Sequence, residues 1–168
     1  KITCECQFFL ACLLSVFLYI LKNIMHHYFA YGSNMSARRI RHRIGWAPSR
    51  IATILHDYQL AFDKQSNDGG KANIQFSSGN NVEGVLYFVK EEDLVVLDKY
   101  EGVADQQYVR HEIEVQDRAG HLMPAVAYVA LNTGKESRPT REYLNFLLEG
   151  EHLLSPEYVT KLEEIATL

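Results

Sequence analysis

The stretch that decides the fold is YFAYGSNM, residues 28–35. Its aromatic and apolar first half is typical of a buried strand, and the break at Gly32-Ser33-Asn34 predicts a tight turn where the strand ends. Glycine has no Cβ, so the backbone of such a turn can come close to a ligand. We therefore expect a strand that ends in a tight turn at Gly32-Ser33-Asn34.

Downstream of this segment, strand-like and helix-like patterns follow in mixed order. Helical spacing begins at Met35, Gly120 marks a hairpin between two alternating segments, and Ser155-Pro156 is a helix-start signal. The order is not the regular alternation of βαβ units, so the sequence indicates the α+β class. Residues 51–63 are expected to form a strand or a bent pair of strands, and further strands are expected over 84–89, 108–115 and 124–131. Helices are expected over 91–100, 140–148 and 156–165.

The composition favours one globular domain that has no nucleic-acid partner. A chain of 168 residues with 47% hydrophobic residues can bury a single core. Its net charge of −4 at pH 7 offers none of the clustered positive charge from which nucleic-acid interfaces draw affinity.

The first 24 residues differ from the rest of the chain. Residues 8–21 form an uncharged run, FFLACLLSVFLYIL, which is shorter than the ~20 residues of a usual membrane span. All three cysteines (Cys4, Cys6 and Cys12) also lie there, so the remainder has no disulfide or thiolate ligand, as is usual in the cytoplasm. We expect residues 1–24 to be an apolar leader outside a domain at 25–168, with membrane contact only if 8–21 is a genuine anchor.

Several motifs lack the features of a catalytic, metal or phosphate site. Residues 68–72 (DGGKA) lack the spacing of a phosphate loop, and the seven histidines show no metal-binding spacing, so neither a metal nor a cofactor is expected. The only basic cluster is interpreted as a solvated helix face, since neither a glycine loop nor an aromatic platform accompanies it. Its members are Arg38, Arg39, Arg41, His42 and Arg43.

A second segment, LDKYEGV at residues 97–103, places Glu101 directly after a short apolar helix. YFAYGSNM and LDKYEGV, in this order, resemble the γ-glutamylcyclotransferase family, which has an AIG2-like fold. The likeness extends over nearly all of residues 28–165. It includes GVLYFV (84–89), QYVRHEIEV (107–115) and AYVAL (127–131).

This resemblance implies an α+β fold built on a small closed antiparallel β-barrel with flanking helices. It also implies that Glu101 is the catalytic acid/base and that a substrate pocket lies where the YGSN turn meets the EGV segment. The resemblance assigns substrate contacts to Tyr28, Phe29, Ala30, Tyr31, Gly32, Ser33, Asn34, Tyr108, Tyr128 and Tyr143.

The implied reaction converts a γ-glutamyl amino acid or a γ-glutamylamine into 5-oxoproline and a free amine. Its nucleophile is an α-amine that is mostly protonated at neutral pH, so one carboxylate able to take and return a proton suits this chemistry. A module of the same fold that binds γ-glutamyl compounds or 5-oxoproline without turnover is the alternative, and a membrane-tethered interaction protein is a third reading that rests on residues 8–21. The expected partner is a small molecule, and a homodimer is left open.

Overall fold

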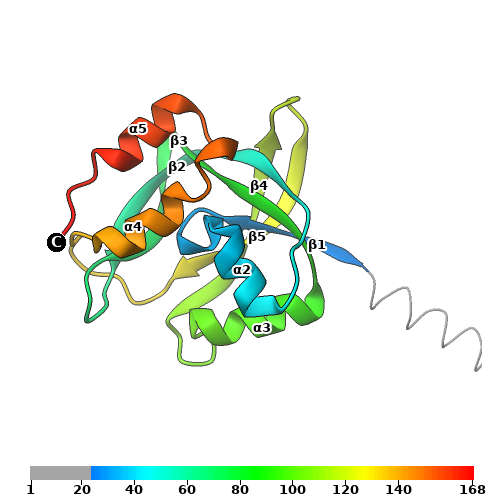
Figure 1. Cartoon of the computed structure of the whole chain (residues 1–168), viewed down its shortest axis with the longest axis horizontal. Coiled ribbons are helices and arrows are strands. Elements are labelled where there is room, and N and C mark those ends of the chain that lie inside the picture. Colours follow the sequence, from blue (N-terminus) through cyan, green and yellow to red (C-terminus); the bar gives the residue numbers. More distant parts are fainter. Residues whose placement is uncertain (1–23) are drawn as a thin grey trace, which may run out of the picture.

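Within residues 24–168, which are the part of the chain that the computed structural model describes, five strands close into a barrel in the order β1-β3-β2-β4-β5 (Figure 1). Neighbouring strands are antiparallel except β1 and β5, which meet in parallel at Tyr28 and Val126. The strands are β1 (Met25–Ala30), β2 (Arg50–Lys64), β3 (Lys71–Lys90), β4 (Tyr108–Asp117) and β5 (Leu122–Ala130).

Within the described residues, four α-helices and two short 3-10 turns flank the barrel, so the expected α+β barrel with flanking helices is confirmed. The cap of the last helix is as predicted: the Ser155 hydroxyl accepts a hydrogen bond from the Tyr158 N–H, and Pro156 occupies the first turn. The helices are α2 (Ala37–Ile44), α3 (Glu91–Glu101), α4 (Arg141–Leu148) and α5 (Pro156–Glu163), and the 3-10 turns are η1 (Ser33–Met35) and η2 (Glu151–Leu153).

The predictions about the leader lie outside the described residues, apart from its last residue, Ile24. They concern the three cysteines and the apolar run at 8–21, and they stay predictions. No helix within residues 24–168 is long and apolar enough to span a membrane.

The main difference from the expected elements is the length of β3. The predicted strand at 84–89 is only the end of a strand that begins at Lys71 and pairs with β2 along most of its course. Apart from Phe76 and Gly79, residues 75–81 of this strand are polar, and the segment is largely exposed, so it lacks the alternation by which a half-buried strand is detected. The helix expected from Met35 also begins later, because η1 and the capping residue Ser36 come first.

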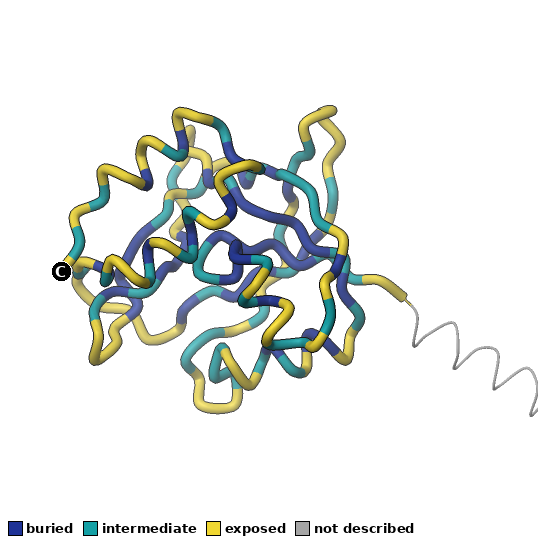
Figure 2. The backbone as a smooth tube through the Cα atoms, viewed as in Figure 1, coloured by how far each residue is buried: buried dark blue, intermediate teal, exposed yellow. Residues whose placement is uncertain are grey.

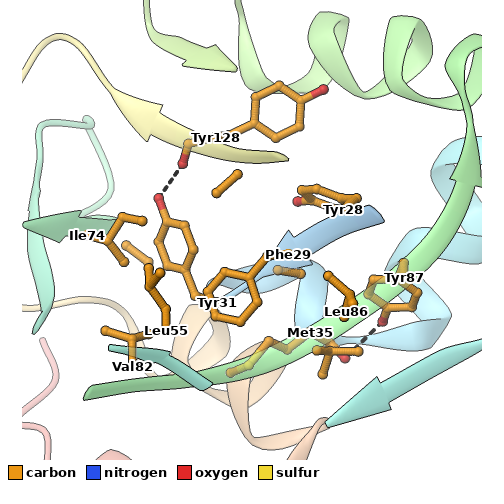
Figure 3. Close-up of a cluster of buried hydrophobic side chains, with 14 of the residues drawn as sticks. Tyr28, Phe29, Tyr31, Met35, Leu55, Ile74, Val82, Leu86, Tyr87 and Tyr128 are labelled. Carbon is orange, nitrogen blue, oxygen red and sulfur yellow. Dashed lines mark hydrogen bonds between the residues drawn. The ribbon is translucent and has the colours of Figure 1, made fainter. Parts of the chain in front are cut away.

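The core fills the barrel and extends beneath α3 (Figures 2 and 3). Leu94 and Leu97 of α3 are fully buried, and each contributes about 2 kcal/mol by leaving water. The hydroxyl of the buried Tyr87 donates to the carbonyl of Met35 over 3.2 Å, which ties the turn after β1 to β3. Both attachments fix the two segments, YFAYGSNM and LDKYEGV, against the same barrel.

Candidate active site

Glu101 is the last residue of α3, and its position follows from how that helix ends. Gly102 adopts a left-handed conformation (φ 64°) and closes the helix, as a C-terminal glycine commonly does. The buried Leu94 and Leu97 hold α3 on the barrel, which turns the Glu101 side chain toward the YGSN turn. The carboxylate is only 16% exposed.

Arg43 and Asn34 together hold one oxygen of the Glu101 carboxylate. Oε1 accepts a hydrogen bond of 2.7 Å from an Arg43 guanidinium nitrogen and one of 3.0 Å from Asn34 Nδ2. Arg43 also donates to Asn34 Oδ1 over 2.8 Å. Both recorded hydrogen bonds of the carboxylate within residues 24–168 end on Oε1, so Oε2 has no protein donor there.

Asn34 links the carboxylate to Tyr28. Its amide nitrogen lies 2.7 Å from the Tyr28 hydroxyl oxygen and donates to it. Because that oxygen acts as an acceptor, the hydroxyl proton of Tyr28 is available to donate elsewhere. Glu101 and Tyr28 are therefore positioned by one amide.

The tyrosines of the site have different partners. The Tyr31 hydroxyl donates to the backbone carbonyl of Tyr128 in a short hydrogen bond (Figure 3). The Tyr128 hydroxyl points the other way and lies 2.7 Å from Asp98 Oδ1 on α3. Tyr31 and Tyr128 thus form walls whose polar ends are already engaged.

Ala72 at the start of β3 fixes the remaining two tyrosines. Its backbone N–H donates to the Tyr143 hydroxyl and its carbonyl accepts from the Tyr108 hydroxyl, both over 3.1 Å. No side-chain pattern signals this role of Ala72, because only its backbone takes part. Sequence reasoning therefore missed it.

The site tyrosines stay protonated across the physiological range. Burial raises the pKa of Tyr28, Tyr31, Tyr108 and Tyr143, and the nearby negative charge of Glu101 raises each of them further. Hydrogen bonds from Ala72 and Ser33 act in the opposite direction on Tyr143. The tyrosines around Glu101 are accordingly neutral. The hydroxyls of Tyr28 and Tyr143 each accept a hydrogen bond and so keep a proton to donate.

Two adjoining cavities meet at Glu101. The inner one measures about 30 Å³, enough for one or two water molecules, and the outer one about 360 Å³. Ser33, Glu101, Tyr108 and Tyr143 line both, so the outer chamber opens onto the inner one beside the carboxylate. The inner cavity is lined by Tyr28, Tyr31, Gly32, Ser33, Asn34, Ala72, Glu101, Tyr108, Tyr128 and Tyr143.

A larger cavity of about 470 Å³ lies elsewhere, next to α5, and includes Phe62, Tyr158 and Leu162. None of the residues that the sequence singled out for chemistry lines it. The smaller pair of cavities is the better candidate, because it contains the enclosed carboxylate and its donors.

Of the predicted site residues, all but Phe29 and Ala30 line the inner cavity. Phe29 neighbours Tyr28 on β1, where successive side chains point to opposite faces, and its ring packs so closely on Gly84 that a Cβ there would lie 2.6 Å from it. Ala30 is buried in the barrel core. The continuous motif thus includes two residues that only support the fold.

The interpretation of the basic cluster as a solvated face is wrong for Arg43. Its side chain is 7% exposed and is paired with Glu101, whereas Arg38, Arg41 and His42 are exposed as expected. Arg39 and Arg43 are four residues apart, so they share the inner face of α2. Helical periodicity predicts that Arg39 and Arg43 share a face, but nothing in the sequence showed that this face packs against α3.

The described residues contain no group of three or more His, Cys, Asp or Glu side chains that could hold a metal ion. Residues that could hold a small polar ligand are the hydroxyl of Tyr28, the Gly32-Ser33 turn and the free oxygen of Glu101.

Comparison with known proteins agrees with this geometry. The AIG2-like family matches residues 81–162. Human γ-glutamylcyclotransferase is 33% identical over 146 residues, which are 82% of this chain and 77% of the human protein, and the mouse protein is 34% identical over the same extent. A solved structure of a γ-glutamyl cyclotransferase superposes with a TM-score of 0.80 at 29% identity, covering 86% of this chain and 89% of the other. The chain therefore belongs to the γ-glutamylcyclotransferase family of cyclising lyases.

Proposed function

We propose that this protein converts a γ-glutamyl amino acid or γ-glutamylamine into 5-oxoproline and a free amine, with Glu101 as general acid/base. The observation that carries the proposal is the Glu101 carboxylate itself. It lies where the two cavities meet, with Oε1 held by Arg43 and Asn34 and with Oε2 free of protein donors among residues 24–168. A carboxylate held by one oxygen offers the other to a substrate ammonium.

The reaction requires that protons leave the attacking nitrogen and arrive on the departing nitrogen. Glu101 takes a proton from the α-ammonium, and the resulting amine attacks the γ-carbonyl carbon to form the ring C–N bond. The bond from that carbon to the departing nitrogen then breaks. Over the cycle two protons leave the attacking nitrogen and two arrive on the departing one, so Glu101 ends as it began. Such acid/base assistance typically supplies about 10²–10⁴ in rate.

The neutral wall suits the charge that develops during attack. The Tyr28 hydroxyl has a proton to donate, and the backbone of the Gly32-Ser33 turn can be approached closely, so both are proposed donors to the oxyanion on the γ-carbonyl. Tyr31, Tyr108 and Tyr143 instead hold the substrate curled, which is an entropic contribution because nucleophile and electrophile belong to one molecule.

The test is turnover of a defined panel by the purified protein. γ-Glutamyl amino acids, γ-glutamylamines and glutathione are each incubated with it, and 5-oxoproline is quantified. Release of 5-oxoproline from at least one compound is expected. Binding of these compounds without any release would favour the alternative, a non-catalytic module of the same fold.

The cytoplasm remains the proposed compartment, on the basis that residues 25–168 contain no cysteine. A homodimer also remains a prediction.

Replacing Gly32 with valine is expected to remove activity with little loss of stability. Gly32 has φ −114°, so the left-handed region is not what requires glycine here. A Cβ would lie 3.1 Å from the Ala72 Cβ and 3.3 Å from the Tyr143 hydroxyl, and the rest of a valine side chain would intrude into the inner cavity. We expect kcat/KM to fall at least ~10-fold while thermal unfolding shifts by only a few degrees.

Gly45 offers the matched control, because it is exposed and a Cβ there meets nothing within 4 Å, although its φ of 84° makes any side chain strained. Gly45→Ala should therefore lower the unfolding temperature without a specific loss of activity. If Gly32→Val lowers activity only in proportion to its loss of thermal stability, Gly32 has a role in folding alone.

A further inference from the structure

Arg39 lines the outer chamber but has no role in the mechanism above. It lies on α2, one turn before Arg43, and its guanidinium carbon sits 4.6 Å from the centre of the Phe146 ring. The side chain is half-buried between α2 and α4. It therefore holds a positive charge at the chamber wall, one helical turn from the residue that binds Glu101.

The other cations around the chamber have carboxylate partners. Arg43 pairs with Glu101 over 2.7 Å, Lys71 pairs with Asp68 over 2.8 Å, and the exposed Arg38 pairs with Glu149.

Arg39 differs from these residues. Its guanidinium makes no hydrogen bond or ion pair with any residue in the described part of the chain, and its Nε is enclosed without an acceptor. Glu142, the remaining acidic residue of the chamber wall, forms no ion pair with it. Burial lowers the pKa of Arg39, and the charge of Arg43 adds to this effect. The charge of Glu101 acts on this pKa in the opposite direction. The half-buried guanidinium therefore has an enclosed Nε without an acceptor, and a carboxylate bound beside it would accept hydrogen bonds from the guanidinium.

We propose that Arg39 binds the α-carboxylate of the departing amino acid, and so selects γ-glutamyl amino acids over γ-glutamylamines that lack this group. The inference rests on the proposed function, because the departing nitrogen must lie beside Glu101 to receive its proton. In an amino acid the carboxylate is one carbon away from that nitrogen. Residues four apart on a helix have Cβ atoms about 5–6 Å apart, so Arg39 neighbours Arg43, the residue that pairs with Glu101.

The planar guanidinium suits a carboxylate better than an ammonium does, because it can donate two parallel hydrogen bonds. Its stacking on Phe146 holds the guanidinium at the chamber wall. The stacking also offers a purely structural explanation of Arg39, so the test has to separate packing from charge. Arg39→Met does this, since methionine keeps an unbranched apolar stem over Phe146 and removes only the guanidinium.

The experiment compares two substrates on each protein: γ-glutamyl-L-alanine and γ-glutamyl-L-alaninamide, which differ in the charge of one group. We expect the parent to favour the alanine compound in kcat/KM by at least ~10-fold, the usual scale of a charge-assisted hydrogen bond. Arg39→Met should lose this preference by slowing only the alanine compound. Arg39→Lys should keep part of it. The control is Arg41→Met, which removes an exposed charge from the same helix and should keep the parental ratio.

Because the readout is a ratio on one protein sample, it does not depend on how much of a variant folds. An unchanged ratio in Arg39→Met overturns the role of Arg39 and leaves the proposed function standing. An equal fall for both substrates also overturns it and assigns Arg39 to packing. A parent protein that cyclises neither compound nor any member of the panel defeats the proposed function, and the selectivity inference falls with it.

Discussion

Glu101→Gln is expected to lower kcat at least ~100-fold, the lower range for loss of an acid/base group. Glutamine keeps the length of the side chain, and its carbonyl oxygen can still accept from Asn34 and Arg43, but an amide cannot shuttle a proton. The variant should therefore fold and bind 5-oxoproline. The measurements are release of 5-oxoproline under saturating substrate and calorimetric binding of the same compound.

Two further variants make this result specific. Glu101→Asp keeps the charge but is one methylene shorter, so it should also be badly impaired. Glu91 lies on the same helix and pairs with Arg110 at the surface, and Glu91→Gln should retain turnover. Parental rates in Glu101→Gln together with loss of activity in Glu91→Gln would show that the carboxylate has been misassigned.

Arg43→Met is expected to cost about 3 kcal/mol of unfolding free energy, and activity as well. The ion pair is largely buried, with 7% of the Arg43 side chain and 16% of the Glu101 side chain exposed. Removing one partner of such a pair leaves an uncompensated buried charge, which typically costs 3–5 kcal/mol. Without the arginine, the Glu101 carboxylate also keeps only Asn34 as a donor within residues 24–168. Denaturant unfolding at pH 7 measures the first effect and 5-oxoproline release the second.

A double-mutant cycle with Glu101→Gln separates the pair from general packing. In the glutamine background Arg43→Met leaves no carboxylate without its partner, so it should cost less than half as much as it does in the parent. If the two costs are equal, Arg43 stabilises the protein through its contacts and not through the carboxylate. Arg41→Met, on the exposed side of α2, serves as the control for loss of a positive charge.

The parts of the fold that could be predicted are those where periodicity and caps agree. The acidic first turn of α3, its buried leucines and the stop at Gly102 together define that helix, and Ser155-Pro156 defines the start of α5. The segment 75–81 of β3 could not be found, since a stretch of strand exposed on both faces has the composition of a loop.

The site also has residues that could be predicted from the sequence and residues that could not. Its tyrosines and Glu101 were predicted through the likeness of two short segments, and the structure brings them around one cavity. The pairing of Arg43 with Glu101 was missed because the sequence does not show which face of a helix packs against another element. Ala72 was missed because it acts through its backbone, and Phe29 was included although strand alternation turns it away from its neighbour Tyr28.

The closure of the barrel has a consequence for how the protein fluctuates. β1 pairs with β3 along its whole length but meets β5 in strand register only at Tyr28 and Val126. Two side-chain hydrogen bonds also cross this seam, from the Tyr31 hydroxyl to the Tyr128 carbonyl and between His27 Nδ1 and the Pro124 carbonyl. Local opening of such a weakly paired edge requires less free energy than global unfolding. Tyr28 and Tyr31 both line the inner cavity, so each opening of the seam would dismantle the cavity while most of the barrel persists. A ligand held by these two residues would keep the strands together, and the amide hydrogens along the seam would then exchange with solvent more slowly in its presence.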